Sequence, residues 1–149
     1  MKKINLIIFL FLISCGYTPI NKLIDKNYSI SEFEINGNNQ VNTIIRKDFI
    51  KYKDTNFEKQ FQIKLSSQIV KATNSKNETG TNSNLSIKII VDLEILENNS
   101  SIKNLNFVEL VNYNSLDNKF ELKQYEKILI KNLTNKILEK IHLNLSTIQ

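Results

Sequence analysis

The sequence predicts an α+β fold, a two-layer sandwich in which two helices pack on one face of a four-stranded, mostly antiparallel sheet. In several segments apolar and polar residues alternate, which is the period of strands, and in two others apolar residues recur every three or four positions, which is the period of helices. The order along the chain is strand, helix, three strands, helix. Elements with one apolar face each can bury those faces by forming a sheet layer and a helix layer.

The N-terminal part of the domain is predicted to be a strand followed by a helix. Residues 28–36 alternate aromatic or aliphatic side chains with polar ones, with one slip, and therefore predict a strand. The segment NGNNQ, residues 36–40, predicts a turn because Asn and Gly tolerate left-handed backbone. Apolar residues three and four apart then predict a helix over residues 43–54, with Asn42 or Thr43 as its N-cap.

Two further strands are separated by a polar stretch. From Phe61 onward apolar and polar residues alternate, and the same pattern is strongest over residues 85–96. Residues 73–84, between these strands, contain no apolar side chain and cannot contribute to a core. We therefore predict a long exposed hairpin loop there, which serves as a solvated connector rather than as a binding element.

The C-terminal part predicts a last strand and a long helix. An Asn-rich turn at residues 97–101 leads into a strand over residues 102–114. Glu109 interrupts the alternation, so we expect a bulge or a change of buried face near Val108. From residue 119 to residue 145 apolar residues recur at steps of three or four, which predicts an amphipathic helix.

The first 14 residues have the layout of a secretory signal peptide. Two lysines near the start precede eight uninterrupted apolar residues, Leu6 to Ile13, and then the small Ser14. This run is shorter than the roughly 20 apolar residues of a membrane-spanning helix. We therefore expect residues 1–14 to be removed, residues 15–27 to form an N-terminal tether, and residues 28–149 to form a single domain.

The only cysteine of the chain, Cys15, directly follows this apolar run. The segment LISC, Leu12 to Cys15, resembles the bacterial lipobox, whose cysteine takes up a diacylglycerol through its sulfur and becomes the first residue. An acylated Cys15 would hold the domain firmly on a membrane, because stable anchoring needs more than one acyl chain. Gly16 is not the Asp associated with retention at the inner membrane, so the expected location is the periplasmic leaflet of an outer membrane. The alternatives are an ordinary cleaved signal with an incidental cysteine and a buried free cysteine.

Composition limits the classes of partner and the sources of stability. The formal charge of the whole chain is +5, and losing Lys2 and Lys3 leaves +3, a mild basic excess that does not predict nucleic-acid binding. With Cys15 committed to lipid, no thiol is left for a disulfide, so stability must come from the apolar core.

Residues suited to catalysis are few, and we predict that the protein is not an enzyme and holds no metal or cofactor. His142 is the only histidine, and near the end of a long helix it is expected to be solvated. The nearest carboxylate along the helix is Glu139. A metal site needs several ligands, and this pair alone does not provide them. Asp92 and Glu94 share a strand face, which we interpret as an exposed polar face. The three glycines form no phosphate-binding loop.

Two segments carry a resemblance to a known family. CGYTP, residues 15–19, resembles the start of the lipopolysaccharide-assembly lipoprotein LptE in alphaproteobacterial-type members. Residues 111–145 also resemble that family: a strand ending in an aromatic-Asn pair, a short polar loop, and one long charged helix that closes the domain. The chain departs from the family at Tyr17, where Phe is commoner, and at Thr18, where a basic residue often stands.

The resemblance implies a non-catalytic subunit that forms a 1:1 complex with the large outer-membrane β-barrel LptD. Such a subunit plugs the barrel, assists its assembly and aids insertion of lipopolysaccharide into the outer leaflet. Only Cys15 carries over from the family with a defined role, that of the lipidation site.

The residues themselves suggest a polar sheet surface that suits the polar lumen of a wide barrel. The sheet face away from the helices is expected to carry Lys64, Ser66, Lys88, Asp92 and Glu94. Three lysines of the sheet are candidates for contacts with lipid A phosphates: Lys64, Lys71 and Lys88. The alternative for each of them is simple solvation of the sheet surface or edge.

Two other functions stay open at this point. The chain could be a periplasmic lipoprotein that binds a small ligand or acts as a pilot for a different outer-membrane assembly. A closed apolar pocket between helices and sheet, or an exposed hydrophobic groove, would favour that alternative. An enzyme with an unrecognised site is the third possibility. The sequence does not reveal whether the chain binds lipopolysaccharide itself.

Overall fold

A computed structural model describes residues 27–53, 57–76, 80 and 82–148 of the chain. In chain order the elements are β1 (Ser29–Gly37), α2 (Asn39–Phe49), the short 3-10 helix η2 (Ile50–Tyr52), β2 (Gln60–Lys76), β3 (Asn82–Glu97), β4 (Ser100–Asn114) and α3 (Lys119–Thr147). The predicted signal peptide, Cys15 and all but the last residue of the predicted tether lie outside the described residues.

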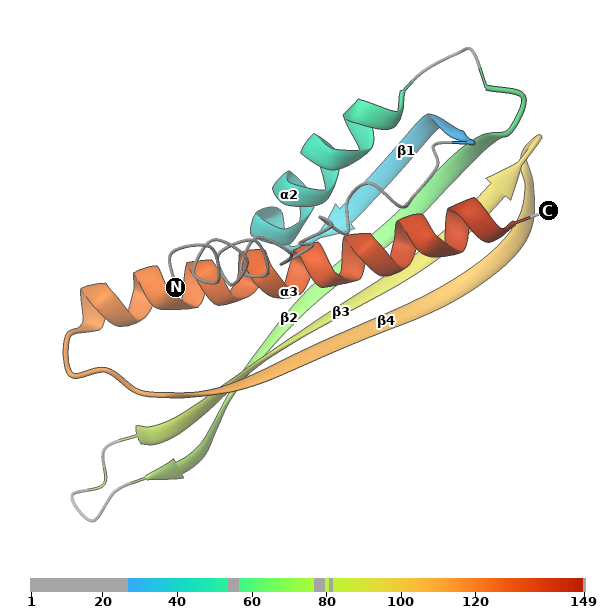
Figure 1. The fold of residues 1–149 in the computed structure, drawn as a ribbon. Helices are drawn as coiled ribbons and strands as arrows, with labels where there is room; N and C mark the ends of the chain where they lie inside the picture. The colour runs from blue at the N-terminus through green and yellow to red at the C-terminus, as the bar shows by residue number, and fades with distance from the viewer. Residues whose placement is uncertain (1–26, 54–56, 77–79, 81, 149) are drawn as a thin grey trace, which may run out of the picture.

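The elements form one sheet covered on one face by two helices (Figure 1). The strand order is β1-β2-β3-β4. β1 pairs with β2 in parallel, and the other two pairs are antiparallel. The predicted α+β two-layer sandwich with a mostly antiparallel sheet is therefore confirmed.

The core lies between the helices and the sheet. β2 and β3 direct alternate apolar residues toward the helices, as their period of two dictates. α2 contributes one buried stripe, and α3 contributes a longer one from its middle and C-terminal turns. The helix residues that complete the core are Val41, Ile45, Phe49, Ile130, Leu133, Ile137, Leu138, Ile141 and Leu145. Burial of these side chains supplies the main stabilisation of a chain of this size.

The turn between β1 and α2 depends on a glycine. Gly37 has a φ of +103°, and a Cβ there would lie 2.0 Å from the carbonyl oxygen of Ser67. Asn38 then caps α2, because its side-chain oxygen accepts hydrogen bonds from the backbone N–H of Gln40 at 3.0 Å and of Val41 at 3.3 Å. The prediction of a helix beginning at residue 43 was wrong, since this cap starts the helix at Asn39. The predicted slip in β1 is confirmed by a register shift between Ile30 and Glu32.

The β2-β3 hairpin is longer than its composition suggests. Residues 73–84 were predicted to be a loop, but β2 continues to Lys76 and β3 begins at Asn82. Pairs of polar side chains cross the extended hairpin, such as Ser75 with Ser83 at 2.9 Å between hydroxyl oxygens. The ladder of backbone hydrogen bonds therefore continues where no apolar residue is buried, and the predicted twelve-residue loop was wrong.

β4 pairs with β3 without the predicted bulge. Its register is regular along the strand and shifts only between Ile95 and Leu96, close to the turn. Glu109 keeps its place on the helix side because it forms an ion pair with Lys140 of α3. In the same way, the Nζ of Lys103 donates a hydrogen bond to Asn144 of α3 at 3.2 Å. A charge on the helix side of β4 was taken for an interruption of the strand, whereas the helix supplies its partner.

The long C-terminal helix follows its prediction closely. α3 begins at Lys119 after Asn118, whose side-chain oxygen accepts from the backbone N–H of Phe120 at 2.9 Å. It ends at Thr147 and runs along most of the length of the sheet (Figure 1). With 29 residues it is about 43 Å long.

Candidate functional site

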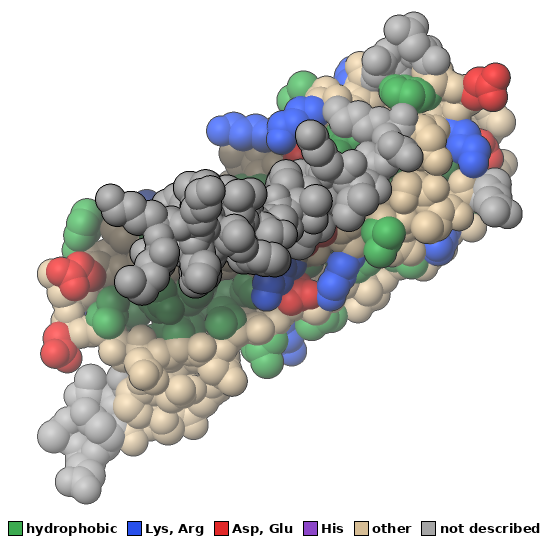
Figure 2. All heavy atoms as spheres, viewed as in Figure 1, with side chains coloured by type: hydrophobic (Ala, Val, Ile, Leu, Met, Phe, Trp, Pro, Cys, Tyr) green, Lys and Arg blue, Asp and Glu red, His purple; other side chains and the backbone are tan. Residues whose placement is uncertain are grey.

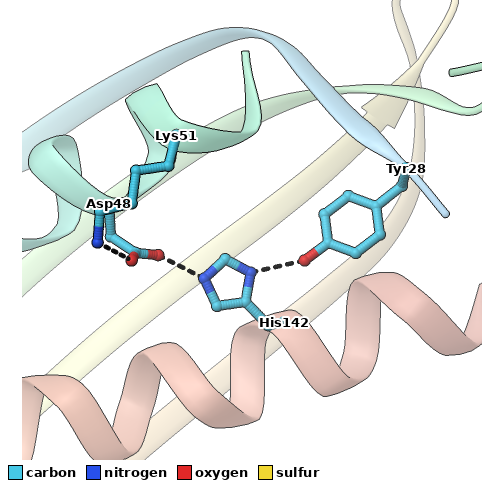
Figure 3. A network of polar contacts seen from close by, with 4 residues as sticks. All are labelled: Tyr28, Asp48, Lys51 and His142. Atoms are coloured by element: carbon cyan, nitrogen blue, oxygen red, sulfur yellow. Dashed lines mark hydrogen bonds and ion pairs between the residues drawn. The ribbon is translucent and has the colours of Figure 1, made fainter. Parts of the chain in front are cut away.

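A buried polar network joins the start of the domain to both helices (Figure 3). The hydroxyl of Tyr28 is hydrogen-bonded to Nδ1 of His142 at 2.6 Å. Nε2 of the same histidine is paired with the carboxylate of Asp48 in α2. Lys51 of η2 donates to the other oxygen of that carboxylate at 3.1 Å. We call Tyr28, Asp48 and His142 the buried network; Lys51 contacts it from the exposed side.

His142 was predicted to be solvated, and this was wrong, because the residue is 5 % exposed. It lies four positions after Leu138 and three before Leu145, on the stripe of α3 that faces the core. Aromatic rings enclose it: Tyr52 stacks on the imidazole with 4.3 Å between ring centroids, and Phe49 meets it edge-on at 6.4 Å.

The network shifts the pKa values of Asp48 and Tyr28. Burial by itself would raise the pKa of Asp48, but the hydrogen bonds and electrostatic attraction of His142 and Lys51 outweigh it and lower that pKa below its usual value. Burial raises the pKa of the Tyr28 hydroxyl, and the neighbouring Tyr52 and Asp48 raise it further. Asp48 therefore stays ionised and Tyr28 stays protonated at neutral pH.

The arrangement is suited to holding three elements together rather than to catalysis. The two ring nitrogens of the histidine are both engaged within the domain, by Tyr28 and Asp48. The ring is also covered by the aromatic side chains of Tyr52 and Phe49. We therefore assign the network a structural role, which is to fix β1 and α2 on the C-terminal half of α3.

Further contacts fix the place where the tether meets the domain. Asn27, the last residue of the tether, donates to the backbone carbonyl of Ser146 at 3.5 Å. Lys59, which precedes β2, donates to the carbonyl of Ile148 at 2.9 Å. The tether therefore joins the domain beside the C-terminal end of α3.

The open face, meaning the sheet face away from the helices, contains two of the three candidate lysines. Lys64 of β2 is paired across the sheet with Glu34 of β1 and with Glu94 of β3. Asp92 lies one step further along this face of β3 and accepts a hydrogen bond from Asn106 at 2.7 Å. These residues line a shallow polar hollow on the open face. The amine of Lys64 thus lies among carboxylates, which is a poor setting for a phosphate.

The second candidate, Lys71, lies on the opposite side of the sheet. Its Nζ is paired with Glu126 of α3, which also accepts a hydrogen bond from the hydroxyl of Tyr113 at 2.6 Å. Burial would raise the pKa of Glu126, but Lys71 and Tyr113 together lower it. Burial, followed by the hydrogen bond and the charge of Glu126, raises the pKa of Tyr113. Lys71 therefore connects the sheet to α3 instead of pointing to an outside partner.

The third candidate, Lys88, lies in apolar surroundings on the open face. It pairs across the sheet with Val70 of β2 and with Leu110 of β4. Ile90 and Val108 lie opposite each other in the next row of the same face. Val70, Val108 and Leu110 are all exposed. We call Val70, Ile90, Val108 and Leu110 the apolar patch.

The three lysines do not form one site. Lys88 pairs with Val70, six positions along β2 from Lys64, which places the two lysines about 20 Å apart on the open face. Lys71 is separated from both by the sheet. Lys88 alone combines a positive charge with exposed apolar neighbours.

Comparison with known proteins identifies the fold. No protein-family model matches the sequence, and neither does any curated protein. Among solved structures, rare lipoprotein B from Shewanella oneidensis is similar, with a TM-score of 0.53 and 10% identity over 76% of this chain and 95% of that chain. A lipoprotein from Caulobacter crescentus has a TM-score of 0.55 and 15% identity over 82% of this chain and 89% of that chain. Lipoprotein B from Nitrosomonas europaea has a TM-score of 0.51 and 12% identity over 82% of this chain and 86% of that chain.

The chain shares the fold of these lipoproteins. At identities of 10–15% the likeness concerns the fold. It covers 86–95% of each of these chains, so most of each chain shares the two-layer fold described here.

Two features of the surface and interior were not predicted from the sequence. The apolar patch had a signal, because Ile90, Val108 and Leu110 fall at open-face positions of strands whose opposite face is already apolar. The buried network had a weaker one: His142 falls in phase with the buried stripe of α3, while Asp48 follows the buried Ile45 by three positions in α2.

The described residues also bear on membranes and metals. None of the described helices combines the length and the apolar character needed to cross a bilayer. In the same part of the chain, no three His, Cys, Asp or Glu side chains gather as ligands for a metal ion.

Proposed function

We propose that the chain is an outer-membrane lipoprotein, anchored through Cys15, that acts as a non-catalytic subunit of the lipopolysaccharide translocon. In this role it occupies an LptD-like β-barrel in a 1:1 complex, helps the barrel to assemble and aids insertion of lipopolysaccharide into the outer leaflet. The fold shared with the rare lipoprotein B chains carries the proposal. The lipobox at Cys15 and the LptE-like segments at residues 15–19 and 111–145 support it independently.

The shape and surface of the domain suit the lumen of a wide barrel. The sheet and α3 run along one long axis (Figure 1), and α3 alone is about 43 Å long, close to the 40–45 Å thickness of a bilayer with its headgroups. Amide and hydroxyl side chains cover the distal β2-β3 hairpin and much of the open face. A polar lumen can hydrogen-bond to such a surface.

Lipopolysaccharide contact is proposed at Lys88. An amine next to exposed Val70 and Leu110 offers a charge-assisted hydrogen bond to a phosphate and an apolar surface to an acyl chain. Lys64 lacks the apolar neighbours and lies beside Glu34 and Glu94. Lys71 is already paired with Glu126.

The alternative is a ligand-binding or pilot lipoprotein of another outer-membrane assembly. Buried apolar side chains fill the space between the helices and the sheet. The hollows on the open face and beside β1 are open and lined mainly by charged and amide side chains. These features favour a protein partner over a small apolar ligand, and the identity of that partner separates a barrel plug from a pilot protein.

The decisive experiment is purification of the tagged full-length chain from membranes in mild detergent, with mass spectrometry of what stays bound after a salt wash. We expect one large LptD-like barrel in equal amount. Recovery of no barrel, or of a secretion pore, would contradict the proposal.

The lysine assignment has its own test with a matched control on the same sheet face. Lys88→Ala should weaken binding of the purified protein to lipopolysaccharide by about tenfold, the effect of losing one charge-assisted hydrogen bond. Lys64→Ala, which removes an identical side chain beside carboxylates, should leave binding unchanged. Equal losses in the two variants would mean that only net charge matters.

A further inference from the structure

The outer side of α2 and η2 combines basic residues with an exposed isoleucine. Residues 39–53 contain four basic side chains and one acidic one, a net charge of +3. Val41, Ile45 and Phe49 are buried against the rest of the domain. Helical geometry therefore turns Lys47, Ile50 and Lys51 outward, because they are separated by three and four positions. Blue side chains project from the molecule at α2 in Figure 2.

These side chains are accessible, although some have intramolecular contacts. Ile50 is 57 % exposed. Lys51 is bonded to Asp48 while 65 % of its side chain remains exposed. The guanidinium of Arg46 lies over the ring of Phe33, 5.6 Å from its centre. Basic residues near a helix C-terminus also interact favourably with the helix dipole, but this does not explain an isoleucine exposed between two lysines.

The position of this surface relative to the tether is fixed by packing of η2 on Tyr28. Tyr52 of η2 stacks on Tyr28, the first residue after the tether, with 5.6 Å between ring centroids. Twelve residues, 16–27, separate Cys15 from Tyr28. Even a fully extended chain of that length spans only about 40 Å. An acylated Cys15 would therefore keep the basic surface close to the membrane.

We propose that Arg46, Lys47, Ile50, Lys51 and Lys53 form a second membrane contact that docks on anionic phospholipid headgroups. We call these five residues the basic surface. The proposal rests on lipidation of Cys15, and it goes beyond the translocon function because it assigns a surface and a lipid partner that this function does not require.

The chemistry of the basic surface fits a phospholipid interface. Lysine and arginine side chains are attracted to anionic headgroups, while an exposed aliphatic side chain can insert among them. The tether raises the local concentration of the surface at the membrane, so a contact too weak to bind alone becomes occupied. Glu32 and Glu34 of β1 line the same hollow as Arg46 and Lys53 and offset part of the positive charge there. Lys47, Ile50 and Lys51 are not among the residues that line this hollow, so they carry most of the proposed contact.

The opposite end of the domain is too far away to compete for the same membrane. Ser29 pairs with Gln60 at the start of β2. From Gln60 to Lys76 the strand rises about 50 Å. The β2-β3 hairpin therefore lies well beyond the tether junction, and the basic surface is the part of the domain expected to meet the lipid.

The test uses the fact that the chain contains no tryptophan. Ile50→Trp places a single fluorophore in the basic surface of the full mature lipidated chain. The protein is reconstituted into vesicles of phosphatidylcholine with or without phosphatidylglycerol, and quenching by lipids brominated in their acyl chains is measured. We expect at least a twofold stronger quenching in the anionic vesicles and its loss in high salt, because the attraction is screened.

A matched control uses Ile128→Trp on α3. Ile128 is 56 % exposed, almost the same as Ile50, but lies in the N-terminal half of α3, away from the tether. Its tryptophan should show no dependence on phosphatidylglycerol. Lys47→Glu in the Ile50→Trp background should abolish the difference between the two vesicle types, whereas Lys123→Glu, with the same change of net charge, should preserve it.

The possible failures are distinguishable. If the lipidated chain does not float with vesicles of either composition, the Cys15 anchor is refuted, and with it both proposals. If it floats but Trp at position 50 is quenched equally in both, the basic surface is refuted and the anchor stands. Equal effects of Lys47→Glu and Lys123→Glu would also overturn the proposal, because the attraction would then be a property of net charge.

Discussion

The two ends of the domain are held together in different ways. At the tether end, Tyr28, Asp48 and His142 bring side chains from the start of β1, from α2 and from α3 into one buried network. At the other end, the β2-β3 hairpin is held by its backbone ladder and by exposed polar pairs such as Ser75 with Ser83. A buried network fixes three elements in one arrangement, whereas an exposed ladder tolerates exchange of its side chains. Orientation is therefore fixed where the tether meets the domain and is less constrained at the hairpin.

Removal of the central histidine should give the largest effect. His142→Ala removes the partner of the Tyr28 hydroxyl, leaves the carboxylate of Asp48 with Lys51 alone of its two described partners, and opens a cavity among aromatic rings. We expect the free energy of unfolding to fall by about 2–4 kcal/mol, because an unpaired buried polar group and a cavity both destabilise. Urea unfolding followed by circular dichroism measures this. A loss below about 1 kcal/mol would contradict a structural role for the network.

Acid should weaken the same end through Asp48. The pKa of Asp48 is lower in the folded protein than its ordinary value of 3.8, so its contribution to stability is complete above that value and is lost as the pH falls below about 4. Asp48→Asn should destabilise the protein by about 1–2 kcal/mol at pH 7 and reduce the further loss between pH 4 and pH 2. Unfolding curves across this range test the prediction. An unchanged acid-induced loss in the variant would assign it to other carboxylates.

An intermediate loss of stability is expected where β2 and β4 contact α3 near the hairpin end of the domain. Glu126→Gln weakens the pairing with Lys71 and changes the hydrogen bond from Tyr113. We expect a loss of about 1 kcal/mol at pH 7, because the lysine is half exposed and solvent screens the pair. Tyr113→Phe provides the comparison, since it removes only the hydroxyl. If Glu126→Gln cost as much as His142→Ala, the contrast between the two ends would disappear.

The smallest effect is expected within the polar ladder. The amide nitrogen of Asn74 donates to Asn84 at 2.9 Å and to Asn112 at 3.2 Å, both exposed contacts, and its oxygen accepts at 3.2 Å from the hydroxyl of Ser86, which is largely buried. Asn74→Ala should change the free energy of unfolding by less than about 1 kcal/mol, because water replaces the two exposed hydrogen bonds and only the bond from Ser86 is partly buried. Hydrogen exchange of the flanking amides should rise only locally. Global destabilisation would show that the hairpin is as constrained as the tether end.

Much of the fold could be predicted from the spacing of apolar residues, because the geometry of a strand or helix determines which side chains share its buried face. The strand over residues 85–96 and the helix from residue 119 were found in this way. The start of α2 was missed because the cap at Asn38 belongs to a turn that also requires Gly37 to approach Ser67 of another strand. The extension of the β2-β3 hairpin was missed because composition reports only which side chains are buried. A ladder of backbone hydrogen bonds can continue where no side chain is buried.

The candidate lysines show how far the same reasoning extends. Lys71 lies ten positions from the buried Phe61, an even number, so strand alternation alone would have placed it on the helix side, away from Lys64. The environment of Lys88 required the register between strands, which brings Val70 and Leu110 beside it. The partners of His142 could not be predicted, because they are 94 and 114 residues away and meet only after the layers pack.

The inward charges of β4 have a consequence for the behaviour of many copies together. β4 lies at one edge of the sheet, and such an edge can recruit a strand from a neighbouring molecule. Lys103 and Glu109 point to the helix side of this edge and are held there by α3. A strand added alongside would have to place side chains next to these two charges, which makes pairing at this edge less favourable. If Cys15 carries the proposed lipid anchor, the molecules are confined to two dimensions and meet more often, and an edge that resists self-association would then keep single copies available for the proposed barrel.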